Sequence, residues 1–290
     1  MKCSSEASSL GSAIVAGEAS ARDPHCCSGG SAGVANGYEA GASRCSDSTT
    51  STTSTVDLQK LARDLRVYAV TDRSWLGLAE NATEAEKQAA LCHQVRAALD
   101  GGTTFIQMRE KHLDHADMIA EATALQEICH AAGVPFVVND AVDVALAMNA
   151  DGIHIGQDDM SALEARALIG PDKILGVSAQ TAEQALQAER DGADYLGVGA
   201  VFPTSSKDDA AEVSHETLAA ICSAVNIPVV AIGGITCENV SELARSGIVG
   251  VAVISAIFAH KDIAAAAAHL AEATLQLANA TTRFAVGATA

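Results

Sequence analysis

The stretch TFIQMREKHLDHADMIAEATALQEICHAAGVPFVVND, residues 104–140, contains one complete structural repeat of this chain. The apolar runs 104–108 and 135–139 have the length of buried strands. The segment 117–133 between them has apolar residues near helical spacing and ends on a glycine. A strand, a helix and a second strand in this order indicate two parallel strands joined by a helical crossover.

The same alternation recurs along the chain. Short apolar runs follow one another, and most are separated by longer amphipathic segments rich in Ala, Leu and Glu. The runs are residues 67–70, 104–108, 135–139, 151–155, 173–177, 195–199, 228–232 and 249–254. Eight such units predict an α/β fold of the (β/α)₈ TIM-barrel type. An open doubly wound sheet is the alternative, although no G-x-G-x-x-G follows the first run, which disfavours a dinucleotide-binding fold.

Composition limits the partners that this chain can have. Of its 290 residues, 49% are hydrophobic and 19% charged, which is typical of a globular protein with a full core. Because 36 acidic residues face 18 basic ones, giving a net charge of −18, nucleic acids and anionic membrane surfaces are disfavoured as partners. No apolar run reaches the roughly 20 residues that a membrane span needs. Small anions can still bind where the few cations converge.

The first 55 residues differ in kind from the rest. They are dense in Ser, Ala, Gly and Thr and show neither helical nor strand periodicity, so we expect a disordered leader over 1–55, a barrel over 56–278 and a tail over 279–290. The leader lacks the continuous apolar segment of a signal peptide and has the acidic residues that transit peptides avoid. The predicted compartment is therefore the cytoplasm.

The cysteines do not indicate a disulfide framework. Four of the eight lie in the leader, and these are Cys3, Cys26, Cys27 and Cys45. A metal at His25-Cys26-Cys27 is an alternative, but the spacings match no zinc pattern and unstructured thiols are favoured. The others are spread over predicted helices, as reduced packing residues are, and these are Cys92, Cys129, Cys222 and Cys237.

Polar or glycine-rich residues follow the predicted strands. They are Arg109 and Lys111 after the second run, Asn139 and Asp140 after the third, Asp158 and Asp159 after the fourth, Ser178 at the end of the fifth, residues 203–207 after the sixth, Gly233 and Gly234 after the seventh, and Ser255 after the eighth. Each alone also fits a surface ion pair, a helix cap or a turn. Because functional residues of such barrels lie at the C-terminal ends of the strands, their recurrence there favours a binding site.

One part of this site is suited to a phosphate group. The segments 233–234 and 254–255 each precede an expected helix start, where backbone N–H groups are available without large side chains. Barrels of this class commonly hold a phosphate in this way.

A second part combines cations with carboxylates. Arg109 and Lys111 supply positive donors, whereas Asp140 and Asp159 supply the hard oxygen ligands that Mg²⁺ prefers. The mixture makes sense if Mg²⁺ joins the carboxylates to a diphosphate. The residues therefore predict one pocket for a monophosphate and one for a metal-bound diphosphate.

Seven blocks in order, QMREK, VVND, DGIHIGQDD, GVSAQT, GVGAVFPTSSK, AIGGI and VISAI, resemble the thiamine phosphate synthase family of (β/α)₈ enzymes of vitamin B1 biosynthesis. The resemblance covers roughly residues 66–275. It implies a transferase that joins 4-amino-2-methyl-5-hydroxymethylpyrimidine diphosphate to a thiazole phosphate by dissociative substitution, with diphosphate released and Mg²⁺ as cofactor.

Roles are carried over position by position from this resemblance. The pyrimidine-diphosphate site implies Gln107, Met108, Arg109, Glu110, Lys111, Asn139, Ser178 and Lys207, of which Arg109, Lys111, Ser178 and Lys207 are the expected catalytic residues. The Mg²⁺ ligands implied are Asp140 and Asp159. The thiazole-phosphate site implies Thr204, Ser205, Ser206, Gly234, Ile254 and Ser255. The family usually shows Thr-x-Thr-Lys where this chain has TSSK, but serine keeps the hydroxyl, so we expect phosphate binding to survive.

Several points stay open in the sequence. The loop 203–207 is expected to act as a lid, and His154 either contacts the pyrimidine or is a satisfied core histidine. A thiazole tautomerase and a non-catalytic ligand-binding barrel are the alternative functions, and the combined cations and carboxylates argue against both. The expected partners are two small-molecule substrates, and the sequence leaves open whether the chain forms a homo-oligomer.

Overall fold

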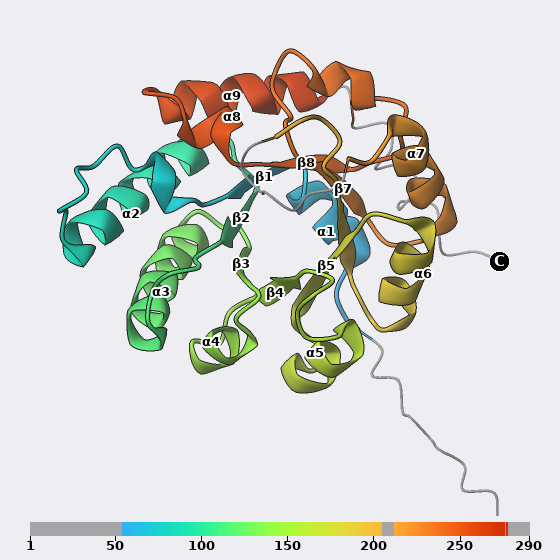
Figure 1. The fold of residues 1–290 in the computed structure, drawn as a ribbon, viewed down its shortest axis with the longest axis horizontal. Helices are drawn as coiled ribbons and strands as arrows, with labels where there is room; N and C mark the ends of the chain where they lie inside the picture. The colour runs from blue at the N-terminus through green and yellow to red at the C-terminus, as the bar shows by residue number, and fades with distance from the viewer. Residues whose placement is uncertain (1–53, 205–211, 276, 278–290) are drawn as a thin grey trace, which may run out of the picture. The chain divides into compact units, whose positions relative to one another are not determined.

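The chain forms a closed barrel of eight parallel strands that pair in chain order, β1 to β8 (Figure 1). A computed structural model describes residues 54–204, 212–275 and 277, all within the second of two units, Met1–Ser48 and Thr49–Ala290. The strands are β1 Val67–Val70, β2 Phe105–Met108, β3 Phe136–Asn139, β4 Gly152–Ile155, β5 Ile174–Ala179, β6 Tyr195–Val198, β7 Val229–Ile232 and β8 Gly250–Val253. The predicted (β/α)₈ barrel is confirmed. The leader and the tail lie almost entirely outside the described residues.

Each strand coincides with one of the apolar runs. Only β5 extends clearly past its run, to Ala179. The ring closes where β1 pairs with β8, for example at Val67 and Val251. Nearly all strand residues are buried because helices cover the outside of the sheet and side chains fill its inside.

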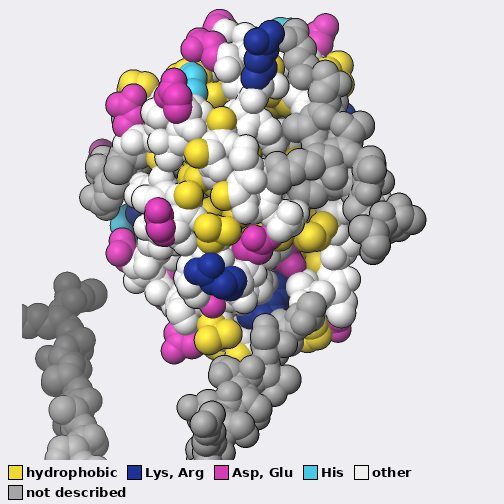
Figure 2. Space-filling view, turned by 90° about the vertical axis from the view of Figure 1, so that its right-hand side faces the viewer, with side chains coloured by type: hydrophobic (Ala, Val, Ile, Leu, Met, Phe, Trp, Pro, Cys, Tyr) yellow, Lys and Arg dark blue, Asp and Glu magenta, His cyan; other side chains and the backbone are white. Residues whose placement is uncertain are grey.

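Helices surround the ring of strands, with α2 and α3 on the left of Figure 1 and α6 and α7 on the right. Their bounds are α1 Leu58–Asp64, α2 Glu84–Asp100, α3 His115–Ala131, α4 Val142–Ala147, α5 Ala162–Ile169, α6 Ala182–Arg190, α7 His215–Ala224, α8 Ser255–Phe258 and α9 Ile263–Ala273, with 3₁₀ helices η1 Arg73–Trp75 and η2 Val240–Leu243. Capping boxes start α2, α5 and α6. On the side that carries α6 and α7, charged side chains are spread widely and hydrophobic ones form small groups (Figure 2).

The connection between β7 and β8 contains η2 instead of a regular α-helix. The Asn239 side chain accepts from the Thr236 N–H at 2.8 Å and donates to the Gly234 carbonyl at 2.9 Å, which ties this segment to the end of β7. Cys237 therefore lies in a turn, and its predicted place on a helix is wrong. The other three described cysteines lie on helices as predicted.

Helix α1, which the sequence did not predict, fills one end of the barrel. Its N-cap Asp57 accepts from two backbone N–H groups, and Leu61 and Leu65 pack into the barrel interior. The Thr55 N–H donates to the Pro171 carbonyl at 2.9 Å, and this bond attaches the segment before α1 to the loop between α5 and β5. Because α1 directly precedes β1, it lies at the N-terminal ends of the strands and leaves their C-terminal ends for a site. Among the described residues, no helix is both long and apolar enough to cross a membrane.

We expect Leu65→Ala to lower the free energy of unfolding by about 2–5 kcal/mol, because Leu65 is fully buried and its loss leaves a cavity beneath the barrel interior. Urea denaturation checks this value. Leu168→Ala on the exposed side of α5 is the control and should change stability by about 0.5 kcal/mol or less. Equal losses in both variants would mean that α1 does not close the barrel.

Candidate functional site

A cavity of about 240 Å³ opens at the C-terminal ends of the strands. Every strand contributes to its wall. The contributing strand residues are Val70, Gln107, Asn139, His154, Ser178, Gly197, Ile232, Ala252 and Val253. The position is the one expected for a (β/α)₈ barrel, since the loops that follow the strands meet at this end.

Half of the predicted site residues line this cavity. They are Gln107, Arg109, Asn139, Ser178, Thr204, Gly234, Ile254 and Ser255. Five described residues do not line it, and these are Met108, Glu110, Lys111, Asp140 and Asp159. Ser205, Ser206 and Lys207 lie outside the described residues.

Met108 faces away from the cavity. Adjacent residues of a strand point to opposite faces of the sheet, so Gln107 points into the barrel and Met108 toward the helices. Met108 is accordingly part of the buried core, with 1% of its surface exposed. Its side chain is placed to pack, which gives no support to its predicted contact with substrate.

Three further polar residues line the cavity: Asp158, which was predicted at this rim without a role, and Gln157 and Gln180, which were not predicted. Gln157 and Asp158 follow β4, and Gln180 follows β5. The Gln157 amide also donates to the Ser178 carbonyl at 2.6 Å, which links the loop after β4 to the end of β5. All three are polar residues that come shortly after a strand, which is the same signal that predicted the other site residues. His154, which was left open, also lines the cavity and is 9% exposed.

The two predicted metal ligands follow neighbouring strands. Asp140 has a φ of 60°, and its backbone N–H donates to the His154 carbonyl at 2.8 Å, so its carboxylate lies just past the end of β3. Asp159 lies in the loop after β4, where its carboxylate accepts from the Gly156 N–H at 2.8 Å. Both side chains are exposed. The described residues contain no group of three or more His, Cys, Asp or Glu side chains suited to hold a metal.

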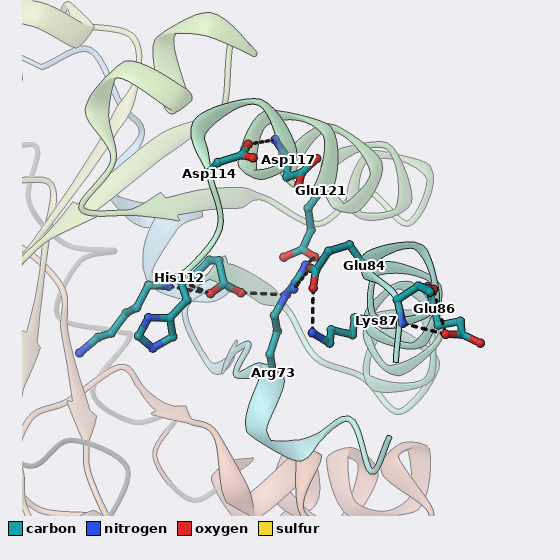
Figure 3. Close-up of polar contacts among 11 residues, drawn as sticks. Arg73, Glu84, Glu86, Lys87, His112, Asp114, Asp117 and Glu121 are labelled. Carbon is teal, nitrogen blue, oxygen red and sulfur yellow. Dashed lines mark hydrogen bonds and ion pairs between the residues drawn. The ribbon is translucent and has the colours of Figure 1, made fainter. Parts of the chain in front are cut away.

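Glu110 belongs to an ion-pair network centred on Arg73. Figure 3 labels Arg73 with its partners Glu84 and Glu121. Arg73, which follows β1, meets Glu84 of α2 at 2.5 Å, Glu110 at 2.8 Å and Glu121 of α3. The same Glu110 carboxylate accepts from the backbone N–H groups of the next two residues, Lys111 at 2.8 Å and His112 at 3.0 Å. Glu110 therefore shapes the loop that carries Lys111.

Burial works against the charges in this network. It raises the pKa of the Glu121 carboxyl, and the hydrogen bond from Arg73 only partly offsets that rise. Burial also opposes the charged form of Arg73, but the bonds to Glu121 and Glu84 outweigh it and leave the pKa of Arg73 raised. One guanidinium thus holds three carboxylates together, and it stays charged.

The segment after β1 also supports Arg109. The Arg109 backbone N–H donates to the Thr71 hydroxyl at 3.1 Å, and its guanidinium lies 3.7 Å from the Asp72 carboxylate. Arg73 pairs with Glu110 in the same region, so the three consecutive residues Thr71, Asp72 and Arg73 all contact the segment after β2. They fix the guanidinium of Arg109 at the wall of the cavity.

The opposite wall is formed by backbone. Gly233 and Gly234 have φ values of 98° and 63°, a region that favours glycine. A Cβ on Gly234 would lie 2.4 Å from the Pro203 carbonyl oxygen and 2.8 Å from the Phe202 Cβ. Glycine therefore allows the loop after β6, which carries Thr204, to rest directly on the loop after β7.

The family model for thiamine monophosphate synthase matches residues 68–257. The chain belongs to this family. It is 50% identical over 200 residues to a thiamine-phosphate synthase of Clostridium tetani, covering 69% of this chain and 91% of the relative. It is 52% identical over 179 residues to one of Moorella thermoacetica, covering 61% and 85%. A solved thiamine phosphate pyrophosphorylase from Pyrococcus furiosus is 39% identical with a TM-score of 0.66, covering 75% of this chain and 98% of that one.

The match to the thiamine monophosphate synthase family contains the whole cavity. Its lining runs from Val70 to Ser255, within the matched residues 68–257, whereas α1 precedes them. A KDPGal structure, 19% identical with a TM-score of 0.52, shows only that the fold is shared.

We expect Gly234→Ala to weaken binding of inorganic phosphate, because the added Cβ would displace the loop that carries Thr204. Gly133→Ala is the matched control, since Gly133 has a similar φ of 71° but open space around it. The backbone strain should cost both variants about 1–2 kcal/mol of stability, and the clash with Pro203 should destabilise Gly234→Ala further. Denaturation and phosphate titration by calorimetry check this. Equal stabilities with unchanged phosphate affinity would contradict the role given to Gly234.

Proposed function

We propose that the chain catalyses the formation of thiamine phosphate from 4-amino-2-methyl-5-hydroxymethylpyrimidine diphosphate and a thiazole phosphate. The observation that carries this proposal is the cavity at the C-terminal end of the barrel. Its wall combines Arg109 after β2 and Asn139 at the end of β3 with the glycines after β7 and Ser255 after β8. In a ring that pairs in chain order, β3 lies across from β7, so two phosphorylated ligands can face each other.

The diphosphate is assigned to the side formed by β2 to β5. Arg109 supplies a guanidinium there, beside the Asp72 carboxylate, and Lys111 and Lys207 are the further cations proposed for the leaving group. Gln107 and Ser178 would contact the pyrimidine deeper in the cavity.

Mg²⁺ is proposed to bind Asp140 and Asp159. Mg²⁺ usually takes one or two carboxylates, with waters and substrate phosphates completing its shell. Two exposed carboxylates after adjacent strands fit that pattern. When bound, the ion would supply positive charge to the departing diphosphate.

The thiazole phosphate is assigned to the loops after β6, β7 and β8. Thr204 and Ser255 offer hydroxyl groups, and Gly234 and Ile254 offer backbone to the cavity. Ser205 and Ser206 complete this proposed set.

The reaction needs control of charge and water more than proton transfer. The bond between the pyrimidine methylene carbon and the diphosphate oxygen breaks, and its electron pair leaves with diphosphate. The lone pair of the thiazole nitrogen then forms the new C–N bond. Arg109 and Lys111 would stabilise the negative charge that develops, and a loop that covers the cavity would keep water from the cationic carbon.

A direct assay tests the proposal. Purified chain should form thiamine phosphate only when both substrates and Mg²⁺ are present. Turnover of a thiazole phosphate alone would favour the tautomerase, and binding of both ligands without product would favour a binding protein. Cytoplasmic location stays a prediction.

We expect Asp140→Asn and Asp159→Asn to raise the Mg²⁺ requirement and to slow turnover by about 10²-fold, or roughly 2.7 kcal/mol. Asparagine tolerates the φ of Asp140 and keeps an oxygen that can accept the Gly156 bond of Asp159. Asp143→Asn, an equal change of charge on exposed α4, is the control. Steady-state rates across a Mg²⁺ titration decide. Wild-type behaviour of both variants at limiting Mg²⁺ would rule out this ligand pair.

The proposed roles of Ser206 and Lys207 can be separated. Ser206→Ala should mainly raise KM for thiazole phosphate, since its hydrogen bond would form in the ground and transition states alike. Lys207→Ala should mainly lower kcat, since its charge matters most as the C–O bond breaks. Kinetics with each substrate varied in turn measure both effects. An unchanged kcat in Lys207→Ala would remove this lysine from the chemistry.

A further inference from the structure

A line of hydrogen bonds crosses the barrel interior and joins two residues of the cavity wall. Gln107 Nε2 donates to Tyr68 Oη at 2.6 Å, and Tyr68 Oη lies 2.8 Å from Tyr195 Oη. Tyr195 Oη lies 3.0 Å from His154 Nδ1, and His154 Nε2 lies 3.0 Å from Ser178 Oγ. Side chains from β1, β2, β4, β5 and β6 therefore form one connected chain.

Two glycines leave room for these hydrogen-bonded side chains. Gly176 pairs in the sheet with both His154 and Tyr195, and a Cβ on it would lie 2.2 Å from the Tyr195 ring. A Cβ on Gly197 would lie 3.1 Å from His154 Cε1. Tyr195 is fully buried and Tyr68 is 1% exposed. Polar groups placed this deep are costly unless they are hydrogen-bonded, so the line of bonds is a defined part of the core.

We propose that Tyr68, Tyr195 and His154 are positioning residues that hold the Ser178 hydroxyl as a hydrogen-bond donor toward the cavity. The proposal rests on the function given above, in which Gln107 and Ser178 contact the pyrimidine diphosphate. The proposal is based on the direction in which each hydrogen bond in this line is donated.

The amide nitrogen of Gln107 faces Tyr68, so the Tyr68 oxygen accepts and its proton goes to Tyr195. Tyr195 in turn donates to His154 Nδ1. A neutral imidazole carries one N–H, which must then be at Nε2, where it donates to Ser178 Oγ. The proton of Ser178 is left for a ligand in the cavity.

Burial keeps both tyrosine hydroxyls protonated. It raises the pKa of both tyrosine hydroxyls above their usual range, so each keeps its one proton. If the Gln107 amide were turned round, every bond could reverse, and Ser178 would donate to His154 instead. The orientation of one amide on β2 thus sets whether a hydroxyl on β5 donates or accepts.

The tautomer of His154 tests this direction without any substrate. In the full chain with ¹⁵N-labelled histidine at pH 8, NMR should show His154 with its proton on Nε2, and His154→Gln identifies the signal by its loss. Tyr195→Phe removes the donor to Nδ1 and should convert this single tautomer into a mixture. A proton on Nδ1 in the unaltered chain would overturn the proposal.

The consequence for binding is tested by a double-mutant cycle. Tyr195→Phe should raise KM for the pyrimidine diphosphate about tenfold and leave KM for thiazole phosphate unchanged. In a Ser178→Ala background it should add nothing, because Tyr195 acts through Ser178. Additive effects of the two changes would overturn the proposal.

Phe105→Leu is the packing control. Phe105 has its ring 5.8 Å from that of Tyr195 but lacks a hydroxyl, so this variant should lose stability and keep both KM values. An equal rise in KM would assign the effect of Tyr195→Phe to packing and overturn the proposal. If the unaltered chain forms no thiamine phosphate, the proposed function fails, and the tautomer alone decides the direction of the bonds.

Discussion

The pairing of β1 with β8 is the contact on which the rest of this structure depends. It closes the sheet, and a closed parallel sheet must present the C-terminal ends of all its strands at one rim. Residues as far apart in sequence as Gln107 and Ser255 thereby reach one cavity. The short loops then decide what that cavity can bind, since the strands leave them little freedom in position.

Much of this arrangement could be predicted from sequence, because parallel strands leave a simple pattern. The apolar runs correctly predicted the strands. Half of the site residues that were assigned at the strand ends line the cavity. Helix α1 was missed because it is short and follows a segment without periodicity. The opposite directions of the Gln107 and Met108 side chains within β2 were missed as well, although the alternation of side chains along a strand already separates them.

Other features depend on contacts between distant residues and leave no local signal. Arg73 lies far from Glu110 in the chain, so the ion pair that shapes the loop before Lys111 cannot be read from either segment. Tyr68 and Tyr195 occupy apolar runs and look like ordinary core residues. Only the fold brings their hydroxyls together, which makes part of the core an extension of the site.

Helix α1 has a consequence for the kinetics of any reaction that takes place in this barrel. Because it fills the N-terminal end, ligands enter and leave the cavity by the opposite end. A ligand whose ring reaches Gln107 and Ser178 lies below one held by the loops after β7 and β8. With the sites proposed above, a pyrimidine diphosphate would then have to enter before the thiazole phosphate, so the closed base of the barrel would favour ordered binding of the two substrates.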